Sequence, residues 1–252
     1  MRLQICSWQL IVAIAFTAFN ASTSIAQEGD DASVTAPYEE AALQRWEKDI
    51  AEFDALNEEQ EPSSESILFI GSSSIRLWKS MQRDMAPYKT IRRGYGGAKF
   101  TDMAVFAERL ITPHQYRAAV MFVGNGISDK PDSHTPDMIE PLVRHIIETS
   151  QQHQPGTLFF LIEITPTQSR FKIWDKIRAV NERLREIALT TPNTYFIATA
   201  GDYLHTDGQP RTELFISDQL HMNEQGYQLW SKLIRRRLDD VLRLQAVEQA
   251  GE

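Results

Sequence analysis

Four short apolar runs recur along the chain, and each is followed by a segment with polar loop residues and helical spacing. The runs are "ILFI" (67–70), "AAVMFV" (118–123), "TLFFLI" (157–162) and "TYFIA" (194–198). Continuous rather than alternating apolarity predicts strands that are buried on both faces, as in a parallel sheet. Strands that alternate with helices predict a doubly wound α/β fold in one domain.

The segments between and around these runs carry helical apolar faces. Apolar residues recur at steps of three and four within 139–147 and 173–187, and again in a final helix from Asn223 to about Leu244, with Asn223 available as its N-cap. A further helix is predicted within 38–62. Its apolar face is formed by Leu43, Trp46, Ile50, Phe53 and Leu56.

The first 26 residues differ from the rest of the chain. Arg2 is followed by the apolar stretch "ICSWQLIVAIAFTAF" and by small residues, which predicts a secretory signal peptide (1–26) cleaved after Ala26. An uncleaved anchor is the alternative, although the stretch is short for a stable membrane span. The remainder divides into a leader and N-terminal helix (27–63), a main domain (64–245) and a tail (246–252). We therefore expect a secreted or periplasmic protein.

Composition and charge narrow the classes of partner and cofactor. The net charge of −8 argues against a nucleic-acid partner, because binding to phosphate backbones relies on clustered Lys and Arg. The only cysteine, Cys6, lies in the predicted signal peptide, so the mature chain would have no disulfide and no cysteine nucleophile or ligand. The histidines do not occur at metal-ligand spacing with one another. The sequence thus predicts neither a metal nor an organic cofactor, and it leaves the oligomeric state open.

Ligands in doubly wound folds bind beyond the carboxyl ends of the strands, so the loops there are the places to look for chemistry. The first loop, "GSSS", places three serines directly after Gly71. Serine and glycine are also common in plain turns and helix caps, so this loop alone decides little. The later segment "RRGYGG" can bring backbone N–H groups close to a ligand through its glycines.

Two further loops add polar side chains. Asn125 lies between two glycines in "VGNG", where its amide can donate a hydrogen bond, although Asn beside Gly is also a turn signature. Asp218 precedes His221 by three positions in "SDQLH". At that spacing a turn can lay the carboxylate against the imidazole, which fixes the tautomer of the ring.

In this order the loops resemble the block pattern of the SGNH/GDSL hydrolase family, over roughly residues 64 to 245. The motifs "ILFIGSSSIRLW", "RRGYGGAKFTDM" and "DQLHMNEQGYQLW" look like those of a secreted or envelope bacterial branch. The resemblance implies a single-domain, three-layer α/β/α sandwich with a mainly parallel, flavodoxin-like central sheet.

The resemblance also implies the roles of the catalytic residues. Carried over onto this sequence, Ser73 is the nucleophile, His221 is its general base, and Asp218 orients that base. Ser72 stands where many family members have Asp.

An oxyanion hole is implied as well. Its donors would be the backbone N–H groups of Ser73 and Gly97, with Gly96 as the less favoured alternative to Gly97, and the side-chain amide of Asn125. Val123 and Gly126 replace the leading Gly and the trailing Asp of the family's G-x-N-D block. These departures leave the Asn donor in place but alter the loop that carries it.

The function implied is hydrolysis of a carboxylic ester through an acyl-serine intermediate, without a cofactor. The resemblance favours short acyl or acetyl groups, including those carried by a carbohydrate. A non-catalytic binding module with the same fold and an acyltransferase that uses the same serine are the alternatives. Four aromatic residues are candidates for a sugar site but are more often found in core or loop packing: Tyr95, Phe100, Phe171 and Trp174.

Overall fold

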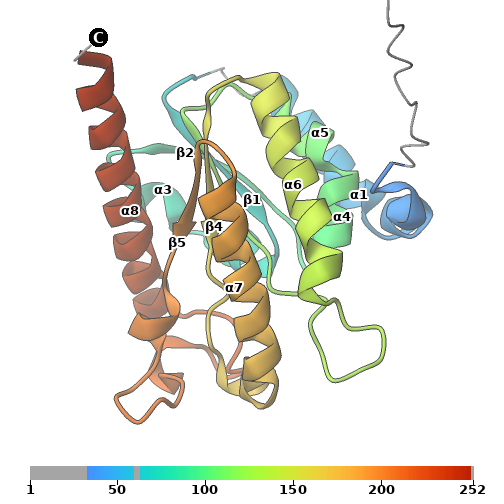
Figure 1. Cartoon of the computed structure of the whole chain (residues 1–252), viewed down its shortest axis with the longest axis vertical. Coiled ribbons are helices and arrows are strands. Elements are labelled where there is room, and N and C mark those ends of the chain that lie inside the picture. Colours follow the sequence, from blue (N-terminus) through green and yellow to red (C-terminus); the bar gives the residue numbers. More distant parts are fainter. Residues whose placement is uncertain (1–32, 60–62, 251–252) are drawn as a thin grey trace, which may run out of the picture. The chain divides into compact units, whose positions relative to one another are not determined.

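The computed structural model describes residues 33–59 and 63–250, with side chains up to 245. Five parallel strands form one sheet in the order β2-β1-β3-β4-β5. They are β1 (Ser66–Gly71), β2 (Lys89–Gly94), β3 (Ala118–Phe122), β4 (Leu158–Ile162) and β5 (Thr194–Ile197). Helices cover both faces of the sheet (Figure 1), so the predicted three-layer α/β/α fold with a parallel sheet is confirmed. The predicted signal peptide lies outside the described residues.

Helices connect the strands, and three of them match the apolar faces that the sequence predicts within 139–147, within 173–187 and after Asn223. The α-helices are α1 (Glu39–Glu59), α2 (Ser73–Leu77), α3 (Met81–Asp84), α4 (Phe100–Val105), α5 (Ala107–Ile111), α6 (Pro136–His153), α7 (Trp174–Thr190) and α8 (Glu224–Ala250). The 3₁₀ helices are η1 (Ala36–Tyr38), η2 (Gln168–Ile173), η3 (Ala200–Tyr203) and η4 (Thr212–Leu214). In the described part of the chain, none of these helices is long and apolar enough to cross a membrane.

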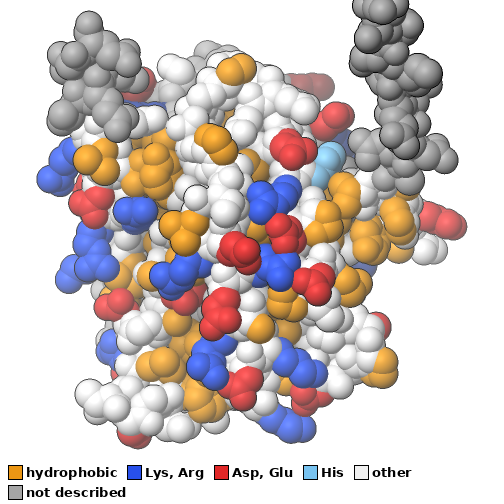
Figure 2. Space-filling model, viewed as in Figure 1, with side chains coloured by type: hydrophobic (Ala, Val, Ile, Leu, Met, Phe, Trp, Pro, Cys, Tyr) orange, Lys and Arg blue, Asp and Glu red, His pale blue; other side chains and the backbone are white. Residues whose placement is uncertain are grey.

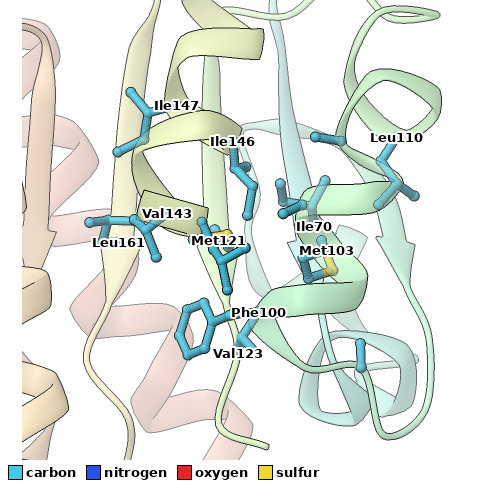
Figure 3. Packing of buried hydrophobic residues seen from close by; sticks show 14 of the residues in the cluster. Ile70, Phe100, Met103, Leu110, Met121, Val123, Val143, Ile146, Ile147 and Leu161 are labelled. Carbon is cyan, nitrogen blue, oxygen red and sulfur yellow. The ribbon is translucent and has the colours of Figure 1, made fainter. Parts of the chain in front are cut away.

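Alternate residues of each strand enter two different cores, one on each face of the sheet. Figure 3 shows Ile70, Met121 and Leu161, from three neighbouring strands, packed toward Val143 and Ile146 of α6. The opposite core is built by residues of the strands together with α2, α3 and α8. Burial on both faces explains why these strands read as continuous apolar runs.

The strand β2 was not predicted from the apolar pattern. Its sequence "KTIRRG" is mostly polar, and Lys89 and Arg92 are exposed. As an edge strand it pairs only with β1, so one side of it faces away from the sheet. Charged side chains are a common feature of such edges because they discourage pairing with other chains.

The N-terminal helix α1 forms as predicted, but its buried face differs from the predicted one. Leu43 and Leu56 are 44% and 50% exposed, whereas Trp46 and Ile50 are buried. The indole Nε1 of Trp46 donates a buried hydrogen bond of 3.0 Å to Asp102 Oδ2 in α4. The prediction of an apolar stripe that includes Leu43 and Leu56 is therefore wrong, because contact with α4 and α5 selects a narrower stripe.

The exposed faces of α6 and α7 carry charges of both signs. Arg183 of α7 pairs with Asp137 and Glu140 of α6, and Arg144 pairs with Glu140 as well. Figure 2 shows acidic and basic side chains intermixed across this side of the molecule. Charges of opposite sign therefore form ion pairs between the exposed faces of these two helices.

The Trp46–Asp102 hydrogen bond should make a measurable contribution to stability. Replacing Trp46 by Phe keeps an aromatic ring but leaves a buried carboxylate oxygen with one donor fewer, which costs about 1–3 kcal/mol. We expect a loss of this size in the free energy of unfolding, measured by urea denaturation. The matched control is Leu43→Ala in the same helix, which should change stability by no more than about 0.5 kcal/mol because Leu43 is exposed. Equal losses in the two variants would contradict this account of how α1 docks.

Candidate active site

The turn after β1 brings the serine loop to the end of β3. Gly71 has φ +148°, and a Cβ at this position would lie 2.1 Å from the carbonyl oxygen of Phe122. Ser72 N donates a hydrogen bond of 3.0 Å to that same oxygen. Only glycine fits so close an approach. Ser73 then becomes the first residue of α2.

Three of the predicted site residues form a chain of hydrogen bonds. Ser73 Oγ lies 2.9 Å from His221 Nε2, and His221 Nδ1 lies 2.6 Å from Asp218 Oδ2. The other carboxylate oxygen, Asp218 Oδ1, accepts from the backbone N–H groups of Leu220 and His221, each at 2.9 Å. The carboxylate is thus held in one orientation toward the ring.

A tight turn positions Asp218 and His221. Ile216 N donates to the His221 carbonyl at 2.9 Å, which closes the segment between them. Asn223 lies two residues after His221, and its Oδ1 accepts from Gly226 N at 3.0 Å, so Asn223 caps α8 as the sequence predicts. The start of the long helix therefore fixes the end of the turn that carries Asp218 and His221.

The helix α8 is fastened to α2, which carries Ser73. Tyr227 donates its hydroxyl hydrogen to the carbonyl oxygen of Ser74 at 2.9 Å. The ring of Trp78 stacks on that of Tyr227, with centroids 5.5 Å apart, and packs against Trp230 at 5.3 Å. These contacts hold the Ser73 and His221 segments together although they are far apart in sequence.

The electrostatics of the pair determine the tautomer of the histidine. Partial burial opposes ionisation of Asp218, but hydrogen bonds from the His221 ring and from the backbone N–H groups of His221 and Leu220 outweigh it, so the pKa of Asp218 is lowered from 3.8. An ionised carboxylate can only accept, so the hydrogen between the two side chains belongs to Nδ1. In the neutral ring Nε2 is then free to accept the hydrogen of the Ser73 hydroxyl.

Asn125 lines the same cavity as Ser73 and His221. Its Nδ2 donates to the Ala98 carbonyl at 3.1 Å, and its Oδ1 accepts from Arg170 Nη2 at 2.6 Å. A carbonyl oxygen only accepts hydrogen bonds and a guanidinium only donates them. These two partners therefore identify which terminal atom of the Asn125 side chain is Nδ2 and which is Oδ1. One N–H of the Asn125 amide remains for a ligand in the cavity.

The glycine loop after β2 lies beside this site. Gly97 has φ +79°, and a Cβ there would lie 3.5 Å from the Trp46 ring. At Gly96 an added Cβ would meet the Arg76 guanidinium at 3.0 Å. The structure brings Ser73, Asn125 and His221 together at one cavity, and neither glycine is among the described residues that line it.

The cavity beside Ser73 is small and mostly apolar. Its volume is about 30 Å³. Thr165 is 5% exposed, and its hydroxyl oxygen is buried without a partner among the described residues. The remaining wall residues include Phe122, Ile164, Thr167, Phe215, Leu220 and Met222.

Three further residues at this cavity were not predicted from the sequence: Thr165, Thr167 and Arg170, which follow the carboxyl end of β4. Their position after a buried strand was a usable signal, because every such loop in a doubly wound fold borders the ligand side. No residue pattern within "TPTQSR" singled them out. In the described residues, no group of three or more His, Cys, Asp or Glu side chains is placed to hold a metal ion.

The four aromatic residues that are candidates for a sugar site divide into two groups. Tyr95 and Phe100 are each 1% exposed and belong to the core, as the packing interpretation predicts. Phe171 and Trp174 are half-buried near the end of η2.

Comparison with known proteins identifies the family. A model of the GDSL-like Lipase/Acylhydrolase family matches residues 70–229, more than half of the 252-residue chain. Platelet-activating factor acetylhydrolase IB subunit alpha1 of Rattus norvegicus is 24% identical over 191 residues, which cover 73% of this chain and 78% of the rat protein.

Two solved structures share the fold at low identity. A GDSL-like lipase from Bacteroides thetaiotaomicron has a TM-score of 0.64 at 15% identity, covering 76% of this chain and 98% of that one. A carbohydrate esterase of family 3 from Talaromyces cellulolyticus has a TM-score of 0.55 at 12% identity, with coverage of 71% and 98%. Fold and family together make the protein a serine ester hydrolase of the SGNH type. The chain belongs to the GDSL-like lipase/acylhydrolase family.

The hydrogen bonds of Asp218 lead to a prediction about the histidine tautomer. In Asp218→Asn the amide oxygen can still accept from the two backbone N–H groups, so the amide nitrogen faces the ring. The ring must then carry its hydrogen on Nε2 and can no longer accept from Ser73, so we expect kcat to fall by about 10³–10⁴-fold. Initial rates with p-nitrophenyl acetate measure this.

Asp175→Asn is the matched control, because Asp175 is an exposed residue of α7 whose side chain pairs only with Arg178 among the described residues. It should keep the wild-type rate. A loss below about tenfold in Asp218→Asn, with the fold intact by circular dichroism, would contradict the assigned tautomer.

Proposed function

We propose that the protein hydrolyses carboxylic esters of short acyl groups, acetyl above all, through an acyl intermediate on Ser73. The observation that carries this proposal is the chain of hydrogen bonds from Ser73 Oγ through His221 to Asp218, at 2.9 and 2.6 Å. It lies at the carboxyl ends of the parallel strands, where this fold class places its ligands.

In the proposed reaction Ser73 Oγ attacks the ester carbonyl carbon while its proton passes to His221 Nε2. A serine hydroxyl is hardly ionised at neutral pH, so it needs a base in contact with it. Collapse of the tetrahedral intermediate breaks the ester C–O bond, and His221 returns the proton to the leaving alcohol. Water then repeats the sequence on the acyl-serine and releases the acid. Asp218 orients the ring and stabilises its protonated form.

Three donors are proposed for the oxyanion. The N–H of Ser73 lies in the first turn of α2, where helix geometry leaves it without an intrahelical acceptor. The second donor is the remaining amide N–H of Asn125. The third is the N–H of Gly97, with Gly96 as the alternative, because the loop that holds both pairs with Asn125 at Lys99. Loss of one such donor costs about 10²–10³-fold in rate in other enzymes.

The size of the cavity supports a short acyl group. A volume of about 30 Å³ suits an acetyl group better than a long chain. The rat relative is named an acetylhydrolase, and the Talaromyces structure is named a carbohydrate esterase. We therefore infer an acetyl or other short ester on a small molecule or a carbohydrate as the substrate.

The proposed place of action is outside the cytoplasm. Its support is the pattern of Arg2, the apolar stretch after it and the small residues before Gln27, which is typical of a secretory signal. A secreted or periplasmic enzyme of a bacterial envelope branch would meet acetylated carbohydrates there.

A series of p-nitrophenyl esters from acetate to laurate tests the proposal. The wild type should hydrolyse the acetate fastest, and Ser73→Ala should lose about 10³-fold or more of kcat, as expected when the nucleophile is removed. Ser74→Ala is the matched control and should keep most of the activity, because only the Ser73 hydroxyl contacts His221 among the described residues. Equal rates for wild type and Ser73→Ala would overturn the enzyme proposal and favour a binding module.

The acyl-serine step has its own readout. Acid-quenched wild type should gain the mass of one acetyl group on the peptide that contains Ser73, and Ser73→Ala should not. Product analysis with an added sugar acceptor separates hydrolysis from acyl transfer: free acetate is expected, and an acetylated acceptor as main product would identify a transferase.

A further inference from the structure

Arg170 is a half-buried cation at the wall of the active-site cavity. It belongs to η2 (Gln168–Ile173), in the connection that follows β4. Its guanidinium donates to the carbonyl oxygen of Gly124 and, at 2.6 Å, to Asn125 Oδ1. Both acceptors are neutral, and no carboxylate of the described residues pairs with it, unlike Arg109 and Arg183, which each contact at least two.

Removing a cation from water without pairing it with an anion costs free energy. The half-buried position of Arg170 therefore needs a physical explanation. Burial lowers the pKa of Arg170, but a guanidinium keeps its proton at neutral pH. In the proposed reaction a negative charge develops in this cavity when Ser73 attacks the ester and again when water attacks the acyl-serine. Fixed charges and dipoles aimed at a developing charge stabilise the transition state more than the ground state.

We propose that Arg170 is a positioning residue for the oxyanion donor Asn125. Two nitrogens of its guanidinium donate to the Gly124 carbonyl and to Asn125 Oδ1. The plane of the Asn125 amide is therefore fixed, and its free N–H stays directed at the cavity. A charge-assisted hydrogen bond to Oδ1 also polarises the amide, which makes its N–H a stronger donor. This inference rests on the proposed function, because Arg170 acts through Asn125.

The loop that carries Asn125 needs such support. Gly126 follows it with φ +92° and provides no side chain to hold the turn. A Cβ at this position would lie 2.6 Å from His134 Nδ1, so the close approach of His134 requires glycine. The guanidinium supplies from another segment the hydrogen bonds that a polar side chain at 126 cannot make.

A double-mutant cycle tests this role with p-nitrophenyl acetate, a neutral ester that cannot form an ion pair with Arg170. Arg170→Met, which removes both charge and donors, should lower kcat by about 10–100-fold and change KM by less than about threefold, because it disturbs a donor used in the transition state. In the Asn125→Ala background the same replacement should change kcat by less than about threefold, because residues that act together are not additive.

Arg170→Lys keeps the charge but cannot span both acceptors, so it should lose about fivefold or more in kcat and show the same dependence on Asn125. This variant also serves if Arg170→Met does not fold, which circular dichroism would show. Arg178→Met, at an exposed position of α7, is the matched control and should keep the wild-type rate.

Three results would overturn the inference: unchanged kcat in both Arg170 variants, an equal loss with and without Asn125, or a rise in KM at constant kcat, which would indicate direct contact of Arg170 with substrate. Ser73→Ala is measured in parallel. If it is as active as the wild type, the proposed function fails. If it is inactive while the Arg170 and Asn125 effects are additive, only the role of Arg170 fails.

Discussion

The approach of β1 to β3 at Gly71 is the constraint on which the site depends. The hydrogen bond from Ser72 N to the Phe122 carbonyl joins the two strand ends, and a side chain at residue 71 would occupy the space of that carbonyl. Because β1 and β3 are neighbours in a parallel sheet, their following loops start from the same edge. That is why Ser73 and Asn125, which are far apart in sequence, line one cavity.

The site joins parts held by the two different cores. Ser73 and His221 depend on the face where α8 packs on α2 through Trp78, Tyr227 and Trp230. The position of Asn125 depends on contacts at the opposite face of the sheet. There Trp46 donates to Asp102, Asp102 accepts from Lys99 N, and Lys99 pairs with Asn125 through a backbone bridge. The N-terminal helix α1 thus supports the loop of Asn125, the proposed oxyanion donor, in addition to covering the sheet.

Sequence patterns predicted those features that depend on local spacing and on burial at both faces. The four apolar runs became β1, β3, β4 and β5, and Asp218 and His221 are three residues apart, so a single turn brings them together. The sequence pattern did not predict the features that are determined by tertiary contacts. The strand β2 is mostly polar because it lies at the edge of the sheet. In α1, packing on α4 and α5 buries Trp46 and Ile50, whereas Leu43 stays exposed. Arg170 had no local signature, because its importance comes from two acceptors on another loop.

The arrangement of charges at the site is complementary to the proposed reaction. Attack by Ser73 creates two charges at once, a positive one on the His221 ring and a negative one on the carbonyl oxygen of the substrate. Asp218 lies 2.6 Å from the ring and is ionised before the reaction starts, while Arg170 contacts the Asn125 amide that we propose as a donor to the oxyanion. Each developing charge therefore meets a charge of opposite sign that is already in place, so little reorganisation is needed in the transition state. The cost of burying Arg170 without a carboxylate belongs to the ground state, and it is offset at the moment when the oxyanion forms.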